Sequence, residues 1–338
     1  MGHDAVVVTG AGGFIGGHLV RDLLASGFAK VRAVDCKPLP EWYQLHPDAE
    51  NLQLDLTEKL ACFEACDGAV EVFNLASDMG GMGFIEMHKA DCMLSVLINT
   101  HMLLAARHAS VKRYLFTSSA CVYAAERQTE AAVVPLKESD AYPAMPEDGY
   151  GWEKLFSERM CRHFMEDFGL STRIVRYHNV YGPHGTYDGG REKAPAAICR
   201  KVIEAKLQGR DEIEIWGDGE QTRSFMYIDD CIKGTKLITG SEFAEPLNLG
   251  SDQLVSINRL VDIVEAIAGI KLRRRYNLDA PKGVRGRNSD NTLIQSVIGW
   301  APSITLEDGM ERTYRWIYDA MQTRNRDPAQ LRVGAGNG

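Results

Sequence analysis

A tyrosine and a lysine four positions apart can together remove a proton from a hydroxyl group. Tyr150 and Lys154 begin and end the segment YGWEK at the start of a predicted helix, so both side chains share one helical face. A phenol is a poor base at neutral pH, but a neighbouring ammonium group favours the phenolate. Ser119 follows a predicted strand and is placed to hydrogen-bond the reacting oxygen. Taken alone, the pair also fits a solvated helix face, so the prediction depends on the motifs around it.

A glycine-rich turn provides that context. Gly10, Gly13 and Gly16 form the segment GAGGFIG between a predicted strand and a predicted helix. Such glycines let the backbone approach a diphosphate, which the helix N-terminus then stabilises. Asp35 ends the next strand, where a carboxylate accepts hydrogen bonds from a ribose and repels a 2′-phosphate, so NAD is favoured over NADP. Asp55 ends the third strand and is interpreted as a contact to the adenine amino group, with a helix N-cap as the alternative.

Composition excludes several classes of protein. The formal net charge of −8 argues against an extended nucleic-acid groove, which needs a basic surface. No stretch approaches 18 uninterrupted apolar residues, so we expect no contact with a membrane through a spanning helix. The 8 cysteines include no CxxC pair, which favours a reduced, cytoplasmic protein. The spacing of His18, His88 and His178 does not indicate a metal site, so we expect no metal.

The elements that must position these residues follow an α/β pattern. Strands are predicted at residues 5–9, 31–35, 52–54, 70–74, 113–118 and 171–177, alternating with helices at 18–26, 91–108 and 153–168. This alternation predicts a Rossmann-type, doubly wound parallel sheet.

The remainder of the chain is predicted to form a smaller C-terminal lobe that binds the substrate. Its predicted elements are helices at 193–207, from 256, and at 306–321, and a strand at 212–216. The predicted cofactor domain covers residues 1–177 with a return segment at 224–252. The substrate lobe covers 178–223 and 253–325, and a mobile tail covers 326–338.

Together, GAGGFIG, Asp35, TSSACVY and YGWEK resemble the extended short-chain dehydrogenase/reductase family of nucleotide-sugar enzymes. The resemblance implies a Rossmann lobe, a lobe that holds a nucleoside-diphosphate sugar, and in many members an NAD that is used transiently. Four further segments narrow it: NLASDMGGMGF, GGREKAPAAICRK, WGDGEQTRSF and GVRGRNSD. Within the family they are similar to the GDP-mannose 3,5-epimerases. This implies GDP-mannose as substrate, GDP-L-galactose as product and a homodimer as the assembly.

The resemblance assigns roles to individual residues. Tyr150, Lys154 and Ser119 serve the oxidation step, and Cys121 with Lys193 serves as the acid/base pair that inverts carbons. The residues expected to bind the cofactor are Gly10, Gly13, Phe14, Ile15, Gly16, Asp35, Asp55, Leu56, Ala76, Tyr150 and Lys154. The residues expected to bind the substrate are Gly80, Ser119, Ala120, Cys121, Asn179, Glu192, Lys193, Ala194, Lys201, Gln221, Thr222, Arg223 and Arg287.

The chemistry of the residue types agrees with these roles. Oxidation of the sugar at C4 to a ketone acidifies the hydrogens on C3 and C5. A thiol and an amine that titrate within reach of neutrality then suit proton removal and delivery. A nearby cation is expected to lower the pKa of the Cys121 thiol, and desolvation is expected to favour a neutral Lys193.

Other interpretations remain open at this point. Cys121 alone fits a packed small residue, and Lys193 alone fits a solvated helix start. A 4-epimerase needs no such pair, and a 4,6-dehydratase typically carries an Asp–Glu pair where Ala120 and Cys121 stand. A non-catalytic dinucleotide-sensing protein is a third alternative. The segment AAERQTE after Tyr123 departs from the resemblance because it lacks an expected proline, and the tail matches poorly.

Overall fold

Seven parallel strands form the central sheet of the computed structural model, which describes residues 4–281 and 283–326. The predicted tail therefore lies outside the described residues, apart from Arg326, where the last helix ends. In spatial order the strands are β11 (Leu247–Leu249), β6 (Thr172–Tyr177), β5 (Arg113–Ser119), β4 (Ala69–Asn74), β1 (Ala5–Thr9), β2 (Val31–Asp35) and β3 (Glu50–Gln53). The order reverses between β1 and β4, which is the switch point where a Rossmann fold binds its ligand.

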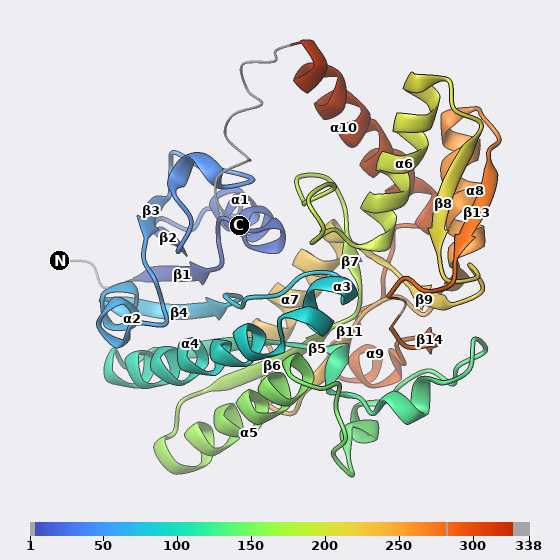
Figure 1. Ribbon diagram of the computed structural model, residues 1–338. Coiled ribbons are helices and arrows are strands. Elements are labelled where there is room, and N and C mark those ends of the chain that lie inside the picture. Colours follow the sequence, from blue (N-terminus) through green and yellow to red (C-terminus); the bar gives the residue numbers. More distant parts are fainter. Residues whose placement is uncertain (1–3, 282, 327–338) are drawn as a thin grey trace.

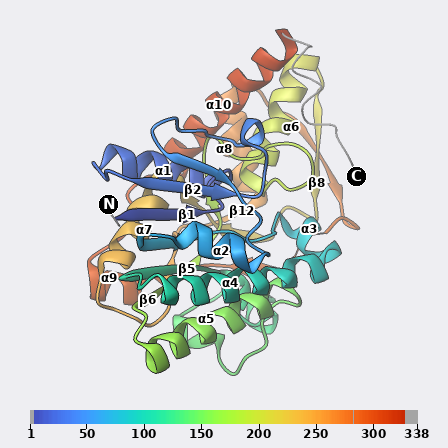
Figure 2. The same ribbon diagram turned by 90° about the vertical axis from the view of Figure 1, so that its left-hand side faces the viewer.

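Helices cover both faces of this sheet, as its strands require. All residues of β1 and β2 are buried, which is expected for β-branched runs packed on two sides. One face carries α1 (Phe14–Ala25) and α7 (Ile228–Gly240), and the other carries α2 (Lys59–Cys66), α4 (Lys89–His108) and α5 (Tyr150–Phe168). Figure 2 shows the two helical layers on either side of the strands. The α/β fold predicted from the sequence is confirmed.

The C-terminal part of the chain builds a second group of packed elements, at the upper right of Figure 1. Here α6 (Ala194–Gln208), α8 (Ile257–Ala268) and α10 (Leu306–Arg326) contact one another. The strands beside them are β8 (Glu212–Trp216), β9 (Thr222–Ser224), β12 (Leu254–Ser256), β13 (Arg273–Asn277) and β14 (Gly286–Arg287). The remaining elements are α3 (Met82–Met87), β7 (Val180–Tyr181), β10 (Met226–Tyr227) and α9 (Thr292–Ile298), which packs on β11. The chain leaves the large sheet after β6 and returns to it at β11.

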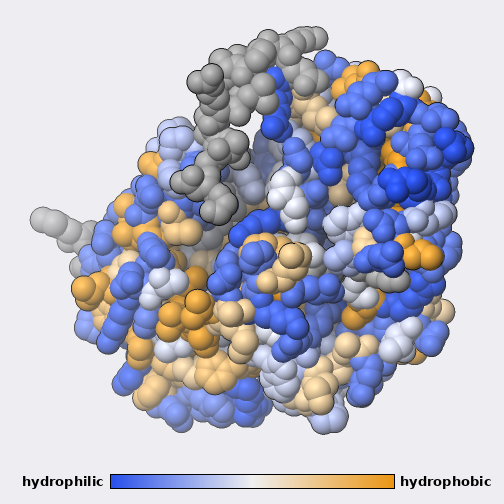
Figure 3. Space-filling view, in the orientation of Figure 1, coloured by the Kyte–Doolittle hydropathy of each residue, from blue (hydrophilic) through white to orange (hydrophobic). Residues whose placement is uncertain are grey.

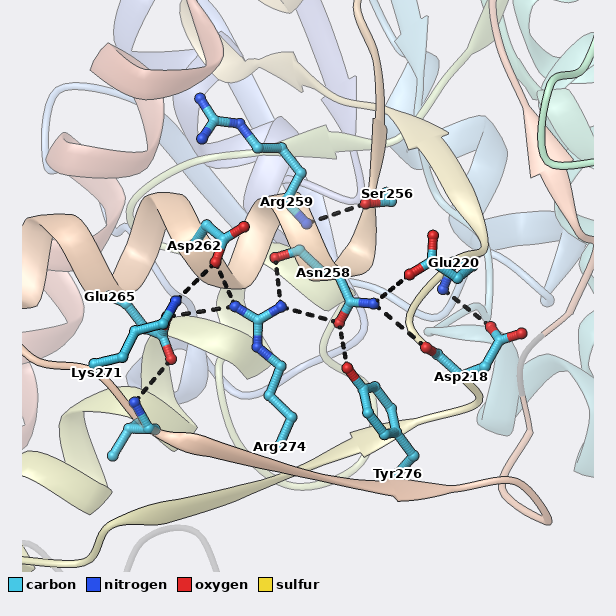
Figure 4. A network of polar contacts seen from close by, with 11 residues as sticks. Asp218, Glu220, Ser256, Asn258, Arg259, Asp262, Glu265, Lys271, Arg274 and Tyr276 are labelled. Carbon is cyan, nitrogen blue, oxygen red and sulfur yellow. Dashed lines mark hydrogen bonds and ion pairs between the residues drawn. The ribbon is translucent and has the colours of Figure 1, made fainter.

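Lys271, just before β13, and Arg274, within it, are tied to α8. Arg274 donates to the side-chain oxygens of Asn258 and Asp262, and Lys271 donates to Asp262 and Glu265 (Figure 4). The backbone N–H of Leu272 also donates to Glu265, over 3.0 Å. These contacts fasten the β8–β13 pair to the outer face of α8.

Three helices begin earlier than predicted, one of them α4, which begins at Lys89 rather than at residue 91. α1 begins at Phe14 rather than at residue 18, and α5 begins at Tyr150 rather than at residue 153. In α1 the reason is that Gly16 and Gly17, with low helix propensity, occupy its first turns. Among residues 4–281 and 283–326, no helix has both the length and the apolar character needed to cross a membrane.

Candidate active site

The glycine loop between β1 and α1 has the geometry that a diphosphate needs. Gly10 has a φ of +67°, and a Cβ on Gly16 would overlap the carbonyl oxygen of Gly10. Gly13 caps α1 without a side-chain hydrogen bond, so the first N–H groups of the helix, at Phe14 and Ile15, face the loop. A helix N-terminus of this kind stabilises negative charge. The loop therefore fits the diphosphate of a dinucleotide.

Other predicted cofactor residues surround the loop. Asp35 is buried, and its carboxylate accepts from the backbone N–H of Gly12 over 3.0 Å. Ala76 lies against Gly10, since a Cβ on Gly10 would come within 3.1 Å of the Ala76 nitrogen. Leu56 is buried in the hydrophobic cluster beneath β2. Asp55 accepts from the hydroxyl of Thr57 over 2.7 Å and from its backbone N–H, which closes a turn before α2. The N-cap of α2 is Glu58, so the capping alternative named above is wrong.

Tyr150 and Lys154 lie in the first turns of α5, buried next to Ser119. Tyr150 is 5% exposed and Lys154 is 1% exposed, and the Lys154 Nζ lies 5.4 Å from the centre of the tyrosine ring. Burial raises the pKa of Tyr150 well above its ordinary value, and the neighbouring Cys121 and Glu153 add to this, while a hydrogen bond with Ser119 opposes it. In the chain by itself burial therefore favours the neutral phenol of Tyr150, and the predicted effect of Lys154 on the phenolate stays a prediction.

A buried polar network holds Lys154 and was missed in the sequence. The Lys154 Nζ lies 3.6 Å from a carboxylate oxygen of Glu153. The other oxygen of Glu153 accepts from the Ser157 hydroxyl over 2.8 Å and from the amide of Asn99. Asn99 in turn accepts from Asn74 at the end of β4. These contacts link α4, α5 and the central sheet behind Tyr150 and Lys154.

A pocket of about 260 Å³ lies next to Tyr150, between the large sheet and the C-terminal elements. Of the residues predicted from the sequence to bind substrate, it brings together Gly80, Ser119, Ala120, Cys121, Asn179, Glu192, Lys193, Ala194, Lys201, Gln221, Arg223 and Arg287. Sequence reasoning missed further lining residues, among them Tyr177, Arg200, Glu214, Trp216 and Phe225. Of these, Trp216 is 45% exposed at the pocket.

Thr222 departs from its predicted place. It is not among the residues that line the pocket in the described part of the chain. Its hydroxyl donates to the carbonyl of Ala131, because alternate residues of β9 face opposite sides and Arg223 takes the side toward the pocket. A contact between Thr222 and the substrate therefore stays a prediction that the lining of this pocket does not support.

Cys121 lies in a short 3₁₀ turn, η2 (Ala120–Val122), directly after β5. It is 6% exposed, and the Ser119 hydroxyl accepts from its backbone N–H over 3.2 Å. A cation is close, since Arg287 Nη1 lies 3.8 Å from the sulfur. Nevertheless burial, followed by the charge of Glu147, raises the pKa of Cys121 to about 12. The expected lowering is therefore wrong, because Arg287 offsets only part of these two effects.

Lys193 faces Cys121 across the same pocket. It is the half-buried N-cap of α6, the helix that begins with Ala194 and Pro195. Burial lowers the pKa of Lys193, and the nearby Cys121 opposes this shift. A thiol and an amine with shifted proton affinities therefore border one space, as the acid/base interpretation requires.

The other cations at the pocket are held in fixed positions. Lys201 donates to the carbonyl of Glu214 over 2.9 Å. Arg223 donates to the carbonyls of Thr222 and Val284, and burial followed by the charge of Arg287 lowers its pKa to about 10. Because Arg223 and Arg287 are register partners in β9 and β14, the two guanidinium groups reach the pocket together.

Comparisons with known proteins agree with this fold. Residues 6–250 match the NAD dependent epimerase/dehydratase family, and the chain belongs to that family. It is 45% identical over 318 residues to the GDP-mannose 3,5-epimerase of Arabidopsis thaliana, covering 94% of this chain and 83% of the relative. It is 44% identical over 324 residues to GDP-mannose 3,5-epimerase 1 of Oryza sativa subsp. japonica, covering 94% and 82%.

Solved structures show the same architecture. A UDP-glucose 4-epimerase of Thermotoga maritima, solved with UDP-glucose, has a TM-score of 0.84 at 24% identity, with 94% of this chain and 99% of that chain covered. MoeE5, solved with UDP-glucuronic acid and NAD, has a TM-score of 0.78 at 30% identity and the same coverage. The chain is therefore an enzyme of an NAD-dependent family, with NAD as its cofactor.

Proposed function

We propose that the chain converts GDP-mannose to GDP-L-galactose by inverting C3 and C5 of the sugar. The observation that carries this proposal is the pocket shared by Tyr150, Cys121 and Lys193. A redox-assisted epimerase needs one group for the hydroxyl at C4 and two more for proton exchange at carbon. The identity of 44–45% with GDP-mannose 3,5-epimerases supports the choice of substrate.

The reaction begins at the C4 hydroxyl. Tyr150 takes the hydroxyl proton, with Ser119 hydrogen-bonding the same oxygen and Lys154 placed to favour the phenolate. The Gly10–Gly16 loop, Asp35 and Lys154 would hold NAD, which would supply a reversible hydride acceptor for C4. Because burial holds Tyr150 as a neutral phenol, the positive charges around the ring must offset that burial during the step.

Cys121 and Lys193 then act on the ketone. A hydrogen on a carbon next to the C4 carbonyl is acidic, because its loss gives an enolate. One of the pair removes this proton from one face, and the other delivers a proton to the opposite face. Their places on different elements, η2 and the start of α6, allow approach from two sides. Tyr150 finally returns its proton to the C4 oxygen when the ketone is reduced again.

The nucleotide end of the substrate needs cations and polar groups farther along the pocket. We assign Lys201, Arg223 and Asn179 to the diphosphate of the substrate. All three line the same pocket as Cys121, and none of them is assigned to the proton exchange. Asn179 is already oriented by a hydrogen bond from its amide to the carbonyl of Ser224, over 3.0 Å. The exposed ring of Trp216 offers a surface for the base.

Proton NMR of GDP-mannose with the enzyme and NAD in deuterated water tests the function. We expect deuterium at both C3 and C5 of the recovered sugar. Inversion at C4 without deuterium would instead identify a 4-epimerase. Exchange at neither carbon, together with turnover of a different sugar nucleotide, would overturn the proposal. Cys121→Ala is expected to abolish exchange while leaving NAD bound, as measured by fluorescence titration.

We further propose that the protein is a homodimer that pairs through α4 and α5. Both helices expose large apolar side chains on the same side of the sheet: Met93, Leu94, Leu97, Trp152 and Phe156. Hydrophobic surface also gathers at the lower left of Figure 3, where Figure 1 places α4. Such a patch marks an interface more often than free surface.

The interface has a direct test. Leu94 and Leu97 are 55% and 40% exposed, so replacing both by Glu leaves the core intact but puts charge on the patch. Light scattering after gel filtration should give the mass of two chains for the parent and of one chain for the variant. Equal masses for the two would contradict this interface.

We also propose a cytoplasmic location. All 8 cysteines are free in the structure, and 7 of them are buried. A catalytic thiol at Cys121 needs a compartment in which thiols stay reduced. Microscopy of the chain fused to a fluorescent protein checks this, and a signal confined to an oxidising compartment would contradict it.

A further inference from the structure

A carboxylate behind the pocket connects the catalytic thiol to Arg287. Glu147 lies three residues before Tyr150, and its backbone N–H donates to the carbonyl of Cys121 over 2.9 Å. Its side chain, 10% exposed, forms an ion pair with the guanidinium group of Arg287. Arg287 also donates from Nε to Gln128 over 2.6 Å, and its Nη1 lies 3.8 Å from the Cys121 sulfur. The three nitrogens of Arg287 thus contact three different side chains.

Glu147 is outside the substrate space. Cys121 and Arg287 line the pocket, whereas Glu147 is not one of its lining residues in the described part of the chain. Its effect on the reaction must therefore pass through the two residues that it contacts. This distinguishes it from Tyr150 and Lys193, which border the pocket themselves.

The charges around the thiol oppose one another. A cation 3.8 Å from a sulfur stabilises the thiolate, whereas a carboxylate that binds the same cation cancels much of its field. Glu147 also lies close enough to the thiol to accept a hydrogen bond from it. The other ionisable groups that face Cys121 are Tyr150 on α5, Lys193 before α6, and Arg223 on β9.

We propose that Glu147 is a positioning residue that neutralises Arg287 and thereby keeps Cys121 a protonated thiol in the resting enzyme. The role rests on the proposed function, because it explains how a thiol beside a guanidinium group keeps a proton to exchange with carbon. A high proton affinity suits both halves of that task, since the thiol holds its proton and the thiolate, once formed, is a strong base. The raised pKa of Cys121, caused by burial and then by Glu147, agrees with this role.

The thiol itself gives the test, without any turnover. The rate of iodoacetamide labelling at Cys121 reports its thiolate fraction, and peptide mass spectrometry separates it from the other cysteines. In Glu147→Gln the uncompensated Arg287 should raise the labelling rate at pH 8 by about tenfold or more, the effect of a change of one or more pKa units. Cys36, which is exposed, should label equally in both proteins.

Three variants separate charge from loosening of the fold. Glu147→Asp keeps the carboxylate and should leave labelling near the parent rate. Asp148→Asn removes the adjacent, exposed carboxylate, which pairs with Lys89 rather than with Arg287, and should change nothing. In Glu147→Gln with Arg287→Gln the cation is gone too, so Cys121 should again resist labelling.

Two outcomes would overturn the role. One is an unchanged rate in Glu147→Gln, and the other is fast labelling that persists in the double variant, since loosening alone would then explain the access. Because the readout does not involve GDP-mannose, either failure leaves the proposed function standing. Conversely, a chain that shows no epimerase activity can still show the predicted labelling pattern.

Discussion

Burial shifts the pKa values of Cys121 and Lys193, the two groups proposed for proton exchange, in opposite directions. Burial raises the pKa of Cys121 to about 12 and lowers the pKa of Lys193, because in each case the charged form is disfavoured. Both groups are thereby biased toward neutrality at physiological pH. A neutral thiol and an amine biased toward its neutral form, in one pocket, can exchange protons with carbon without a large electrostatic penalty.

Replacing Lys193 by Arg separates charge from proton transfer. The guanidinium group keeps a positive charge but does not give up its proton near neutral pH. Lys193→Arg should therefore reduce deuterium incorporation into the sugar by roughly 10²- to 10⁴-fold, the usual contribution of a general acid or base. Thermal unfolding should stay close to that of the parent. Incorporation at the parent rate would remove Lys193 from the mechanism.

The residues predicted from the sequence are identified by their neighbours in the chain, whereas the residues that were missed depend on partners far away in the chain. Cys121 and Lys193 stand in short segments, TSSACVY and GGREKAPAA, whose neighbours identify them. Glu147 and Gln128 have no such local signal, because their partner Arg287 is 140 and 159 positions away. The direction in which the pKa of Cys121 shifts could not be predicted from the sequence either. The sequence can suggest a nearby cation, but it does not show the burial and the carboxylate that outweigh this cation.

At the scale of elements, the close contact of α5 with η2 brings Tyr150 next to Cys121. Gly151 makes this approach possible, since a Cβ there would overlap the carbonyl oxygen of Cys121 and lie 3.1 Å from Pro146. The strands β1 and β2 match their predicted ranges because buried β-branched runs have clear ends. Helix starts were predicted less well, since glycine near an N-terminus hides the helical pattern in both α1 and α5.

Gly151→Ala tests the contact between α5 and η2. The added methyl group must push the helix away, which should lower the free energy of unfolding by about 1–3 kcal/mol and reduce activity as Tyr150 moves from Cys121. Gly240→Ala at the end of α7 is the matched control, because its Cβ would meet no atom within 4 Å. Urea denaturation and the deuterium assay measure both. Equal behaviour of the two variants would show that the contact tolerates a methyl group.

At the scale of the whole molecule, buried histidines make stability depend on pH. Burial lowers the pKa of His18 to about 4 and that of His178 to about 3, from an ordinary value of 6.5. The unfolded chain therefore binds protons below pH 6.5 while the folded chain does not. The stability that these residues contribute is complete above pH 6.5 and is lost as the pH falls.

Urea denaturation at pH 7 and pH 5 measures this loss. Each histidine should lower the free energy of unfolding by on the order of 2 kcal/mol over this interval. Most carboxylates titrate at lower pH, so the interval reports mainly on histidine. A free energy of unfolding that is equal at the two pH values would contradict the burial of these side chains.

The residues that surround the Cys121 thiol are far apart along the chain. Arg287 follows Cys121 by 166 positions, and β11, which completes the large sheet, follows β6 by about 70. At a ribosomal rate of roughly 5–20 residues per second, Cys121 emerges roughly 8 to 33 s before its guanidinium partner. During that interval the nascent chain carries a thiol whose charge environment is incomplete, next to a sheet that lacks its final edge. The reducing state of the surroundings therefore matters to the Cys121 thiol during synthesis, and under the proposed function it matters during catalysis as well.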